Sequence, residues 1–415
     1  MRTIYVDKDI PRILLTSILK PVWPGVIFSK VAPTHFAELP EPPLPGPRWV
    51  RVKNYQCGIC ASDLSFLTMA VDPGIAPAAL PGLQRFYLGH EPVGEVSEVG
   101  PGVTRVHPGD RVIMDTGNAT CAAQEIEPPC PQCARGDPAL CENASAGRGV
   151  QGVGGGWGDS YTAHESAIYP VPPDISDDQA TLIEPLSVAL RAVLHRTPAP
   201  GQHVLVLGSG TIGLCALQCV KALAPGCHIT AVARHPHQVA MARRLGADEV
   251  VDGTDIYAAT AKITGARLYK GMFGNRMLLG GFDVIYDCVG SAHTLRDSLR
   301  CTKAGGAVVV VGIKFRPLKL DLTPVWNQEV QLLGTFAHGQ HTWQGTERHD
   351  YDLVVDLLRS GKLTSDGFIT HRFPLARWRE AVRTATDKRS GSIKVVIDQR
   401  QGETESKRKT AIPSP

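Results

Sequence analysis

The stretch VLVLGSGTIG, residues 204–213, determines the fold class of this chain. Its first four residues are apolar and predict a buried strand, and its last six match the pattern G-x-G-x-x-G at the start of an apolar helix over 212–223. In that context Gly208 permits a tight turn, Gly210 lets a pyrophosphate approach the backbone, and Gly213 lets helix pack on strand. The stretch therefore predicts a dinucleotide site, in preference to a turn that merely connects strand to helix. The predicted cofactor-binding residues of this turn are Gly208, Gly210, Thr211, Ile212 and Gly213.

Strand and helix signals continue to alternate on both sides of this turn. Apolar runs predict further strands at 229–232, 284–286 and 308–311, and a second helix is expected at 238–245. This alternation is typical of an α/β fold with a doubly wound parallel sheet. The less regular stretch 261–281 is expected to hold a helix with a loop insertion.

The N-terminal part of the chain has a different texture. Glycine and proline recur every few residues up to about residue 169, with short β-branched runs between them, which predicts an irregular β domain. A proline-rich segment leads to an expected first strand at 49–52, and a helix is expected at 182–194. The last strand is expected at 393–397. The expected organisation is a β domain over 1–185, a cofactor domain over 186–325, a return segment over 326–400 that completes the β domain, and a disordered tail over 401–415.

The overall composition excludes several classes of protein. A chain of 415 residues with 43% hydrophobic and 20% charged residues is typical of a soluble protein of two domains. A formal charge of +3 is too small to indicate nucleic-acid binding, and no apolar run approaches the roughly 20 residues of a membrane span. The N-terminus lacks the pattern of a signal peptide, so a cytoplasmic location is expected. Eleven cysteines, an odd number, make a poor disulfide framework, and their clustering indicates metal instead.

Three cysteines form one cluster, Cys130, Cys133 and Cys141, with the spacing C-x2-C-x7-C. Thiolates at this spacing can surround a tetrahedral Zn²⁺, and Cys121 is the predicted fourth ligand, with Glu127 as the oxygen alternative. A site closed by four protein ligands leaves no position for substrate, so this zinc would be structural. A nucleic-acid-binding zinc ribbon would need a basic surface, whereas acidic residues surround these cysteines. Free buried thiols are the remaining alternative.

A second set of candidate ligands is dispersed along the chain: Cys60, Ser62, His90, Glu91 and Glu184. Spacing alone does not join them into one site. Cys60 could be a core thiol, His90 a core histidine with satisfied hydrogen bonds, and Glu184 a carboxylate that caps a helix. Ser62 could equally cap a helix or a turn.

Together these segments resemble the zinc-containing medium-chain dehydrogenases, particularly their polyol and threonine dehydrogenase branch. The resemblance covers roughly residues 45–398. CGICASD at 57–63 is similar to the family's cysteine segment of the catalytic zinc, with Cys60 as the ligand, and GHEPVG at 89–94 is similar to its histidine segment. IEPLSV at 183–188 resembles a polyol-branch segment that brings a glutamate near the metal, and the cysteine cluster resembles the structural zinc lobe.

The resemblance implies a GroES-like β domain, a Rossmann domain and substrate in the cleft between them. It implies a zinc-dependent alcohol dehydrogenase with two zinc ions, one catalytic and one structural. Cys60, His90 and either Glu91 or Glu184 would hold the catalytic zinc, and Ser62 would relay the proton. The first cysteine of the family's lobe pattern falls at Glu127 here, and a histidine often found after the catalytic cysteine is replaced by Ser65.

The expected reaction is hydride transfer between an alcohol and a nicotinamide cofactor, because zinc acidifies a bound hydroxyl. NADP(H) is expected in preference to NAD(H), which remains possible. The acid that normally binds the ribose 2′-hydroxyl about 20 residues after the glycine pattern is missing, and Arg234 stands there instead. Arg234 could also be a solvated surface cation. The expected partners are a small alcohol or carbonyl substrate and further copies of the chain in a dimer or tetramer, with neither nucleic acid nor membrane. A zinc-free quinone or enone reductase and a non-enzymatic cofactor sensor are the alternative functions.

Overall fold

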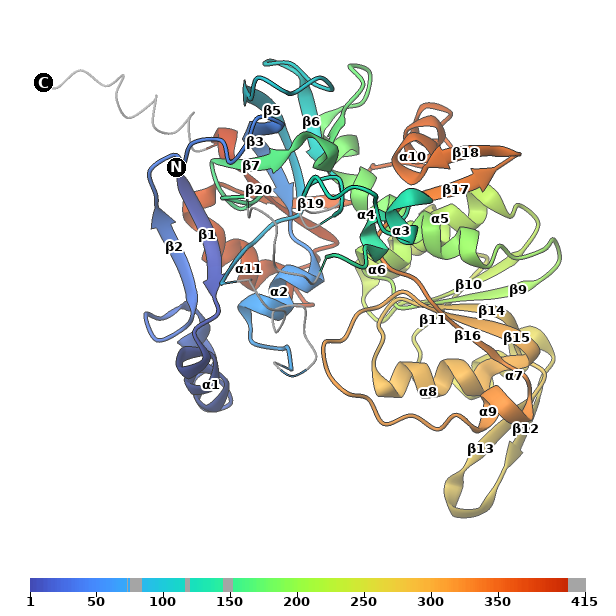
Figure 1. Ribbon diagram of the computed structural model, residues 1–415. Coiled ribbons are helices and arrows are strands. Elements are labelled where there is room, and N and C mark those ends of the chain that lie inside the picture. The colour runs from blue at the N-terminus through green and yellow to red at the C-terminus, as the bar shows by residue number, and fades with distance from the viewer. Residues whose placement is uncertain (73, 75–83, 116–119, 145–151, 402–415) are drawn as a thin grey trace, which may run out of the picture. The chain divides into compact units, whose positions relative to one another are not determined.

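The computed structural model describes residues 1–72, 74, 84–115, 120–144 and 152–401 (Figure 1). The chain forms two compact units. Unit 1 comprises Met1–Glu184 together with the segment from Phe368 onward, and unit 2 comprises Pro185–Gly367. The first division lies one residue from the expected one, but the chain returns to unit 1 at Phe368 and not at 326. The expected tail lies, apart from Gln401, outside the described residues.

Unit 2 contains a six-stranded sheet in the order β11-β10-β9-β14-β15-β16, with every neighbouring pair parallel. This is the doubly wound sheet that the alternating pattern predicted, and Figure 1 shows α5 and α8 on its opposite faces. Because the strand order reverses between β9 and β14, the switch point of the sheet lies at the end of β9. The strands are β9 (His203–Leu207), β10 (His228–Val232), β11 (Glu249–Val251), β14 (Phe282–Asp287), β15 (Thr302–Val310) and β16 (Gln331–Gly334). The helices are α5 (Thr211–Leu223), α6 (Pro236–Arg244), α7 (Ile256–Thr264), α8 (Ala292–Cys301), α9 (Thr323–Asn327) and α10 (Asp350–Arg359).

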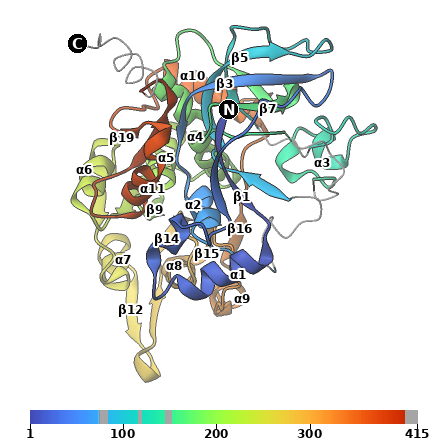
Figure 2. The same cartoon turned by 90° about the vertical axis from the view of Figure 1, so that its left-hand side faces the viewer.

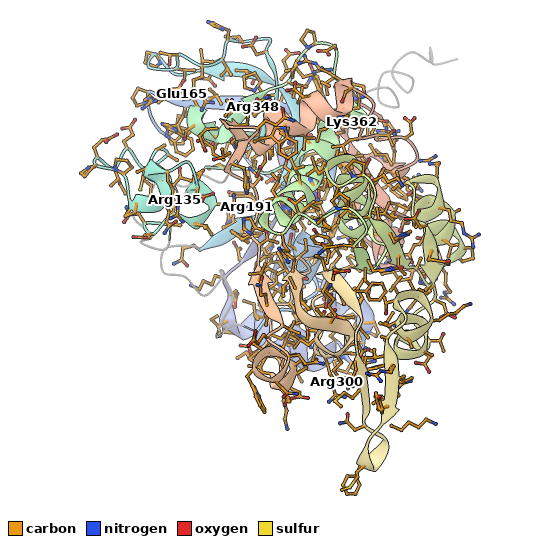
Figure 3. The ribbon with its side chains drawn as sticks, turned by 90° about the vertical axis from the view of Figure 1, so that its right-hand side faces the viewer. Arg135, Glu165, Arg191, Arg300, Arg348 and Lys362 are labelled. Carbon is orange, nitrogen blue, oxygen red and sulfur yellow. The ribbon has the colours of Figure 1, made fainter. Side chains whose placement is uncertain are left out.

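Unit 2 also contains two hairpins, each of which forms a separate two-stranded sheet. The expected loop insertion within 261–281 is a β-hairpin, β12 (Arg267–Lys270) and β13 (Arg276–Leu279), which projects from the unit (Figure 1). Arg300, labelled in Figure 3, donates to Oδ1 of Asn275, in the turn between the two strands, at 2.7 Å and to Asp321 Oδ2 at 2.9 Å. The second hairpin, β17 (Gln340–Trp343) and β18 (Thr346–His349), precedes α10. β16, this hairpin and α10 all lie beyond residue 326, which is why unit 2 ends later than expected.

Unit 1 is built on a sheet in the order β19-β20-β3-β5-β6-β8, with β7 also paired to β3. Its core consists of alternating apolar residues of these strands, among them Val50, Val52, Val96, Val112 and Tyr161. The strands are β3 (Trp49–Gly58), β5 (Glu91–Val99), β6 (Arg111–Met114), β7 (Ser160–His164), β8 (Ile168–Pro170), β19 (Ile369–Phe373) and β20 (Lys394–Asp398). The helices of unit 1 are α1 (Ile10–Leu19), α2 (Ala61–Leu67), α3 (Pro131–Ala134) and α11 (Trp378–Thr386).

The helix α4 (Asp177–His195) contains the division between the two units. It begins five residues before the predicted start, so Pro185 lies inside it and not in its first turn. The reason is a reciprocal cap: the Ser176 N–H donates to Gln179 Oε1 at 2.8 Å and the Gln179 N–H donates to Ser176 Oγ at 3.2 Å. Arg111 pairs with Asp177 at 3.1 Å and ties this first turn to β6.

The N-terminal segment is more regular than expected. The first strand is β1 (Arg2–Asp7) and not 49–52, and it pairs with β2 (Thr34–Glu38) and β4 (Arg85–Tyr87) in a three-stranded antiparallel sheet. The helix α1 lies between β1 and β2 in sequence and follows the end of β1 (Figure 2). Within the described part of the chain, no helix has the length and apolar character that a bilayer span requires.

Candidate functional site

Cys60, His90 and Glu91 come together at one end of the β3–β5 pair. β3 ends at Gly58, and Cys60 is the N-cap residue of α2. Glu91 begins β5 directly opposite Gly58, with His90 just before it. One ligand atom from each of Cys60, His90 and Glu91 lies within 4.8 Å of the other two. Only glycine fits at residue 58, because a Cβ there would lie 1.9 Å from Glu91 Oε2.

Asp63 holds the ring of His90. Its carboxylate is buried, and Oδ1 lies 3.3 Å from His90 Nδ1 and accepts from the Gly89 N–H at 3.0 Å. This contact makes Nδ1 the protonated nitrogen and leaves the lone pair of Nε2 for a metal. Desolvation lowers the pKa of His90, but Asp63 and Cys60 outweigh it and raise the pKa well above its usual value.

Glu91 forms a buried ion pair with Lys394. The Lys394 Nζ lies 2.7 Å from Oε1 and 2.6 Å from Oε2 of Glu91, and both side chains are almost fully buried. The same ammonium donates to the Ile59 carbonyl at 3.3 Å. Desolvation lowers the pKa of Lys394, but Glu91 and Cys60 raise it above its usual value, so the lysine stays charged. The cluster of Cys60, His90 and Glu91 therefore has a buried cation paired with its carboxylate.

Glu184 lies outside the three-residue cluster, although the charges of that cluster affect its pKa. Desolvation raises the pKa of Glu184 to about 7, with His90 opposing the rise and Glu91 adding to it. Ser62 is the second residue of α2 and is half-buried, and its hydroxyl makes no hydrogen bond within the described part of the chain. The structure thus brings Cys60, His90 and Glu91 together and leaves Glu184 and Ser62 beside them.

The second cluster joins Cys121 to the three closely spaced cysteines. All four sulfur atoms lie within 4.8 Å of one another, with Cys121 Sγ 3.6 Å from Cys141 Sγ and Cys130 Sγ 4.0 Å from Cys141 Sγ. Four sulfurs placed about 2.3 Å from a tetrahedral zinc ion would lie about 3.8 Å apart, so this donor set fits zinc. Glu127 is not part of the cluster.

Backbone and side-chain N–H groups surround these sulfurs. Cys121 Sγ accepts from the Cys130 N–H at 3.3 Å and from Asn143 Nδ2 at 3.1 Å. Cys130 Sγ accepts from the N–H groups of Cys133 and Glu142 at 3.5 and 3.4 Å. The bond from Cys133 is the main reason that the pKa of Cys130 falls to about 6. N–H donors favour the thiolate form that a metal requires.

The glycine turn has the geometry that its sequence predicted. A Cβ at Gly213 would lie 1.7 Å from the Gly208 carbonyl oxygen, so a side chain there would push α5 off the turn. A Cβ at Gly210, the N-cap residue of α5, would meet no atom within 4 Å, which leaves open space at the start of the helix. The N–H groups of Thr211 and Ile212 begin that helix, and such a helix start suits a pyrophosphate. Ser209 Oγ donates to the Val232 carbonyl at 2.9 Å and fixes the turn against β10.

Arg234 is the second residue after the end of β10 and is exposed. The side chains after it include the stacked rings of His235 and His237, whose centroids are 5.7 Å apart. Asp252 follows β11 by one residue, and Arg234 contributes to the lowered pKa of Asp252, after hydrogen bonds to Thr254. An acidic group therefore lies near Arg234 on the neighbouring strand of the sheet.

Sequence reasoning did not assign roles to Asp63 and Lys394. Asp63 stands three residues after Cys60 in the segment CGICASD, so its signal was present in the motif. Lys394 opens the last strand, and nothing in its neighbourhood in sequence indicates a buried charge. Only the pairing of β20 with β3 brings it to Glu91.

Comparison with known proteins agrees with this geometry. The family model described as alcohol dehydrogenase GroES-like domain matches residues 46–173, and the one described as zinc-binding dehydrogenase matches residues 211–349. An L-idonate 5-dehydrogenase of Vitis vinifera is 30% identical over 360 residues, which cover 85% of this chain and 88% of the relative. A sorbitol dehydrogenase of Arabidopsis thaliana is 29% identical over 359 residues, which cover 86% of this chain and 90% of the relative.

A solved structure shows the same fold with a cofactor bound. It is a zinc-binding dehydrogenase of Sinorhizobium meliloti, described as bound to NADP, and it is 25% identical with a TM-score of 0.66. The match covers 88% of this chain and 95% of that structure. The predicted fold class, a GroES-like domain with a Rossmann sheet, is confirmed. The chain belongs to the zinc-type alcohol dehydrogenase family of medium-chain, NAD(P)-dependent oxidoreductases.

Proposed function

We propose that this chain oxidises a hydroxyl group of a polyhydroxylated alcohol, such as a polyol or sugar derivative, or reduces the matching carbonyl, with NADP(H) preferred over NAD(H). The convergence of Cys60, His90 and Glu91 within 4.8 Å of one another is the observation that carries the proposal. The substrate class is inferred from the relatives, which are named for L-idonate and sorbitol. The eleven free cysteines fit a reducing, cytoplasmic setting.

We assign the catalytic zinc to Cys60, His90 and Glu91, and the structural zinc to Cys121, Cys130, Cys133 and Cys141. Glu91 is preferred to Glu184 because its carboxylate is part of the compact cluster. Three protein ligands leave an open position, whereas four thiolates close the site. A zinc ion in the open site would act as a Lewis acid on the substrate hydroxyl.

The chain's own residues position the reacting groups. Asp63 fixes the tautomer of His90, and Lys394 holds the Glu91 carboxylate in place. Ser62, whose hydroxyl has no described partner, is the proposed group that accepts the substrate proton and passes it on. The N–H groups at the start of α5 would bind the pyrophosphate of the cofactor, and the Arg234 guanidinium would bind its 2′-phosphate.

The test combines metal analysis of the purified protein with activity assays. Polyols, sugar alcohols and simple alcohols are tried as substrates, and their oxidation is monitored by the absorbance of the reduced cofactor. Two zinc ions per chain and polyol-dependent reduction of NADP⁺ are expected. Cys60→Ser should lose one zinc and the activity together. The alternative is a zinc-free reductase. In that case the purified protein would contain no zinc, it would reduce an enone with NADPH, and a chelator would not change the rate of that reaction.

The choice between the two glutamates is tested by separate substitutions. Glu91→Gln should lower the zinc content of the catalytic site, because an amide binds Zn²⁺ more weakly than a carboxylate. Glu184→Gln should retain the metal. The opposite result would move the ligand assignment from Glu91 to Glu184.

A further inference from the structure

Unit 1 contains a pocket of about 270 Å³, and none of the residues assigned above to metal or cofactor lines it. Its lining combines four polar side chains, a glycine and a valine: Asp7, Gln84, Arg85, Tyr87, Gly152 and Val153. Asp7 is the last residue of β1, and Arg85 and Tyr87 are the ends of β4, so the pocket borders the three-stranded N-terminal sheet. Its volume suits a small ligand, because pockets for drug-sized ligands usually begin at about 300 Å³.

An ion pair in the pocket lining holds a guanidinium and a carboxylate in fixed positions. Asp7 and Arg85 are paired residues of β1 and β4, and Arg85 Nε donates to Asp7 Oδ1 at 2.9 Å. The guanidinium lies over the ring of Tyr5, 3.9 Å from its centroid. The other oxygen of the carboxylate, Asp7 Oδ2, lies 3.4 Å from His35 Nε2. The side chains of Asp7 and Arg85 are 31% and 35% exposed, so a ligand in the pocket can reach both.

These polar groups favour an uncharged ligand that is rich in hydroxyl groups. The Asp7 carboxylate would repel an anion, and the Arg85 guanidinium would repel a cation. A hydroxyl group can donate to the carboxylate or accept from the guanidinium, so two neighbouring hydroxyls can bond to both groups at once. Gln84 adds an exposed amide that donates and accepts, and its side chain makes no hydrogen bond within the described part of the chain. Because the ion pair already holds its two groups in place, less entropy is lost when a ligand binds.

Two segments of the chain lead from this pocket to the cluster that contains His90. Tyr87, in the pocket lining, stands three residues before His90, which is at most roughly 10 Å of extended chain. The other segment runs from Val153, also in the lining, to Gly156, whose N–H donates to the Gly89 carbonyl at 2.8 Å. The pocket and the candidate metal ligands are therefore neighbours within unit 1.

We propose that this pocket is a subsite for an uncharged polyhydroxylated chain, and that it binds the part of the substrate that lies away from the reacting hydroxyl. The inference rests on the proposed function, because it extends the proposed polyol or sugar substrate beyond the candidate metal site. Asp7 lies outside the residues that either family model matches. The subsite therefore depends on the N-terminal strand of this chain.

The first experiment measures sorbitol binding to the full-length protein by isothermal titration calorimetry, with no cofactor added so that no turnover occurs. Arg85→Lys keeps the charge beside Asp7 but removes the planar fork of the guanidinium, so the Kd for sorbitol should rise roughly tenfold. Arg12→Lys is the same change at an exposed arginine of α1 and should leave the Kd unchanged. A wild type that does not bind sorbitol, or equal Kd values for the wild type and Arg85→Lys, would overturn the proposal.

A second variant and a second ligand make this test independent of one substitution. Val153→Phe fills part of the pocket and keeps every polar group of the lining, so it should also weaken sorbitol binding; it replaces Arg85→Lys if that variant fails to fold. Gluconate, a polyhydroxylated anion, should bind more weakly than sorbitol. Tighter binding of gluconate that is lost in Arg85→Lys would contradict the proposal and assign the pocket to a carboxylate.

The second experiment compares a long and a short substrate. In Arg85→Lys the KM for sorbitol should rise roughly tenfold with kcat little changed, because the lost contact lies away from the reacting hydroxyl. The kcat/KM for 1,2-propanediol, which is too short to reach the pocket, should stay the same. Equal losses for both alcohols would show that Arg85 acts at the metal site and would overturn the subsite. If the wild type oxidises no polyol, the proposed function fails, and sorbitol binding that Arg85→Lys weakens still supports the pocket as a polyol site.

Discussion

Asp63 is expected to determine how firmly the proposed catalytic site holds zinc, because it fixes the ring of His90. Asp63→Asn keeps the volume of the side chain but weakens the charge-assisted contact with His90 Nδ1. We expect zinc affinity to fall 10–100-fold, the usual effect of removing the partner of a metal-binding histidine, measured by competition with a chromophoric chelator. Ser65→Ala is the control on the same helix, since the Ser65 hydroxyl bonds only to the Ala61 carbonyl. Equal affinities of the two variants would exclude this role for Asp63.

Lys394 is expected to matter for stability as well as for the site. Lys394→Met leaves the Glu91 carboxylate buried without its cation, which typically costs about 3–5 kcal/mol. Urea unfolding of the metal-free protein should show this loss, and adding Glu91→Gln to Lys394→Met should restore part of it because both charges are then gone. If the double variant is no more stable than Lys394→Met, the loss of the ion pair does not explain the lower stability of Lys394→Met.

The proposed preference for NADP(H) rests on Arg234. Arg234→Ala removes a charged hydrogen bond to the 2′-phosphate, worth about 1.5–3 kcal/mol, so kcat/KM for NADP⁺ should fall roughly 10–100-fold while that for NAD⁺ changes little. Arg243→Ala, an exposed arginine of the next helix, should change neither value. An enzyme that favours NAD⁺ and is indifferent to Arg234→Ala would refute the preference.

At the scale of single residues, the sequence predicts the candidate ligands that cluster better than it predicts the residues that support them. Cys60, His90 and Glu91 lie in short motifs whose chemistry is local, and the structure brings them together. Lys394 was not predictable because a lysine in a terminal strand is ordinarily solvated. Its role depends on a pairing between strands that are far apart in the chain. Glu184 was an equal candidate for the third ligand, because the sequence alone does not show which glutamate lies closer to Cys60 and His90.

The cysteine lobe is an element whose fourth member the sequence left open. Cys121→Ser removes one of four clustered thiolates, so the zinc content should fall by one ion per chain. Glu127→Gln changes the alternative ligand and should leave the zinc content unchanged. The two variants are compared by metal analysis after dialysis. Loss of zinc from the Glu127 variant, with retention in the Cys121 variant, would reverse the assignment.

Other elements show where pattern reading works and where it fails. The helix α5 begins at Thr211, one residue before the predicted start, because the glycine turn and the apolar run specify nearly the same boundary. The hairpin β12–β13 was expected to be a loop, since its short strands expose most of their side chains and so lack a buried face. The helix α1 was not predicted for a related reason: several of its apolar side chains, among them Leu14 and Ile18, are exposed.

For the whole molecule, alternation of strands and helices identifies the class of fold but not the end of a domain. β16 completes the parallel sheet only at Gly334, and α10 follows before the chain returns at Phe368. The mixed composition after residue 326 suggested that the chain returns to unit 1 there, because the short strands and the hairpin of this segment resemble the short strands and turns of unit 1 in sequence. The boundary is set by which sheet a strand joins, and that is a tertiary property.

The pairing of β20 with β3 has a consequence for how the protein is made. Glu91 and Lys394 are 303 residues apart, so on the ribosome the carboxylate is synthesised long before its counterion. Nascent domains tend to fold from the N-terminus as they emerge. Unit 1 is an exception, because its central strand β3 must wait for one of the last strands of the chain. Unit 2 lies entirely between these strands, so a nascent chain that stops before Lys394 would have a finished cofactor sheet and a candidate metal site that lacks the counterion of Glu91.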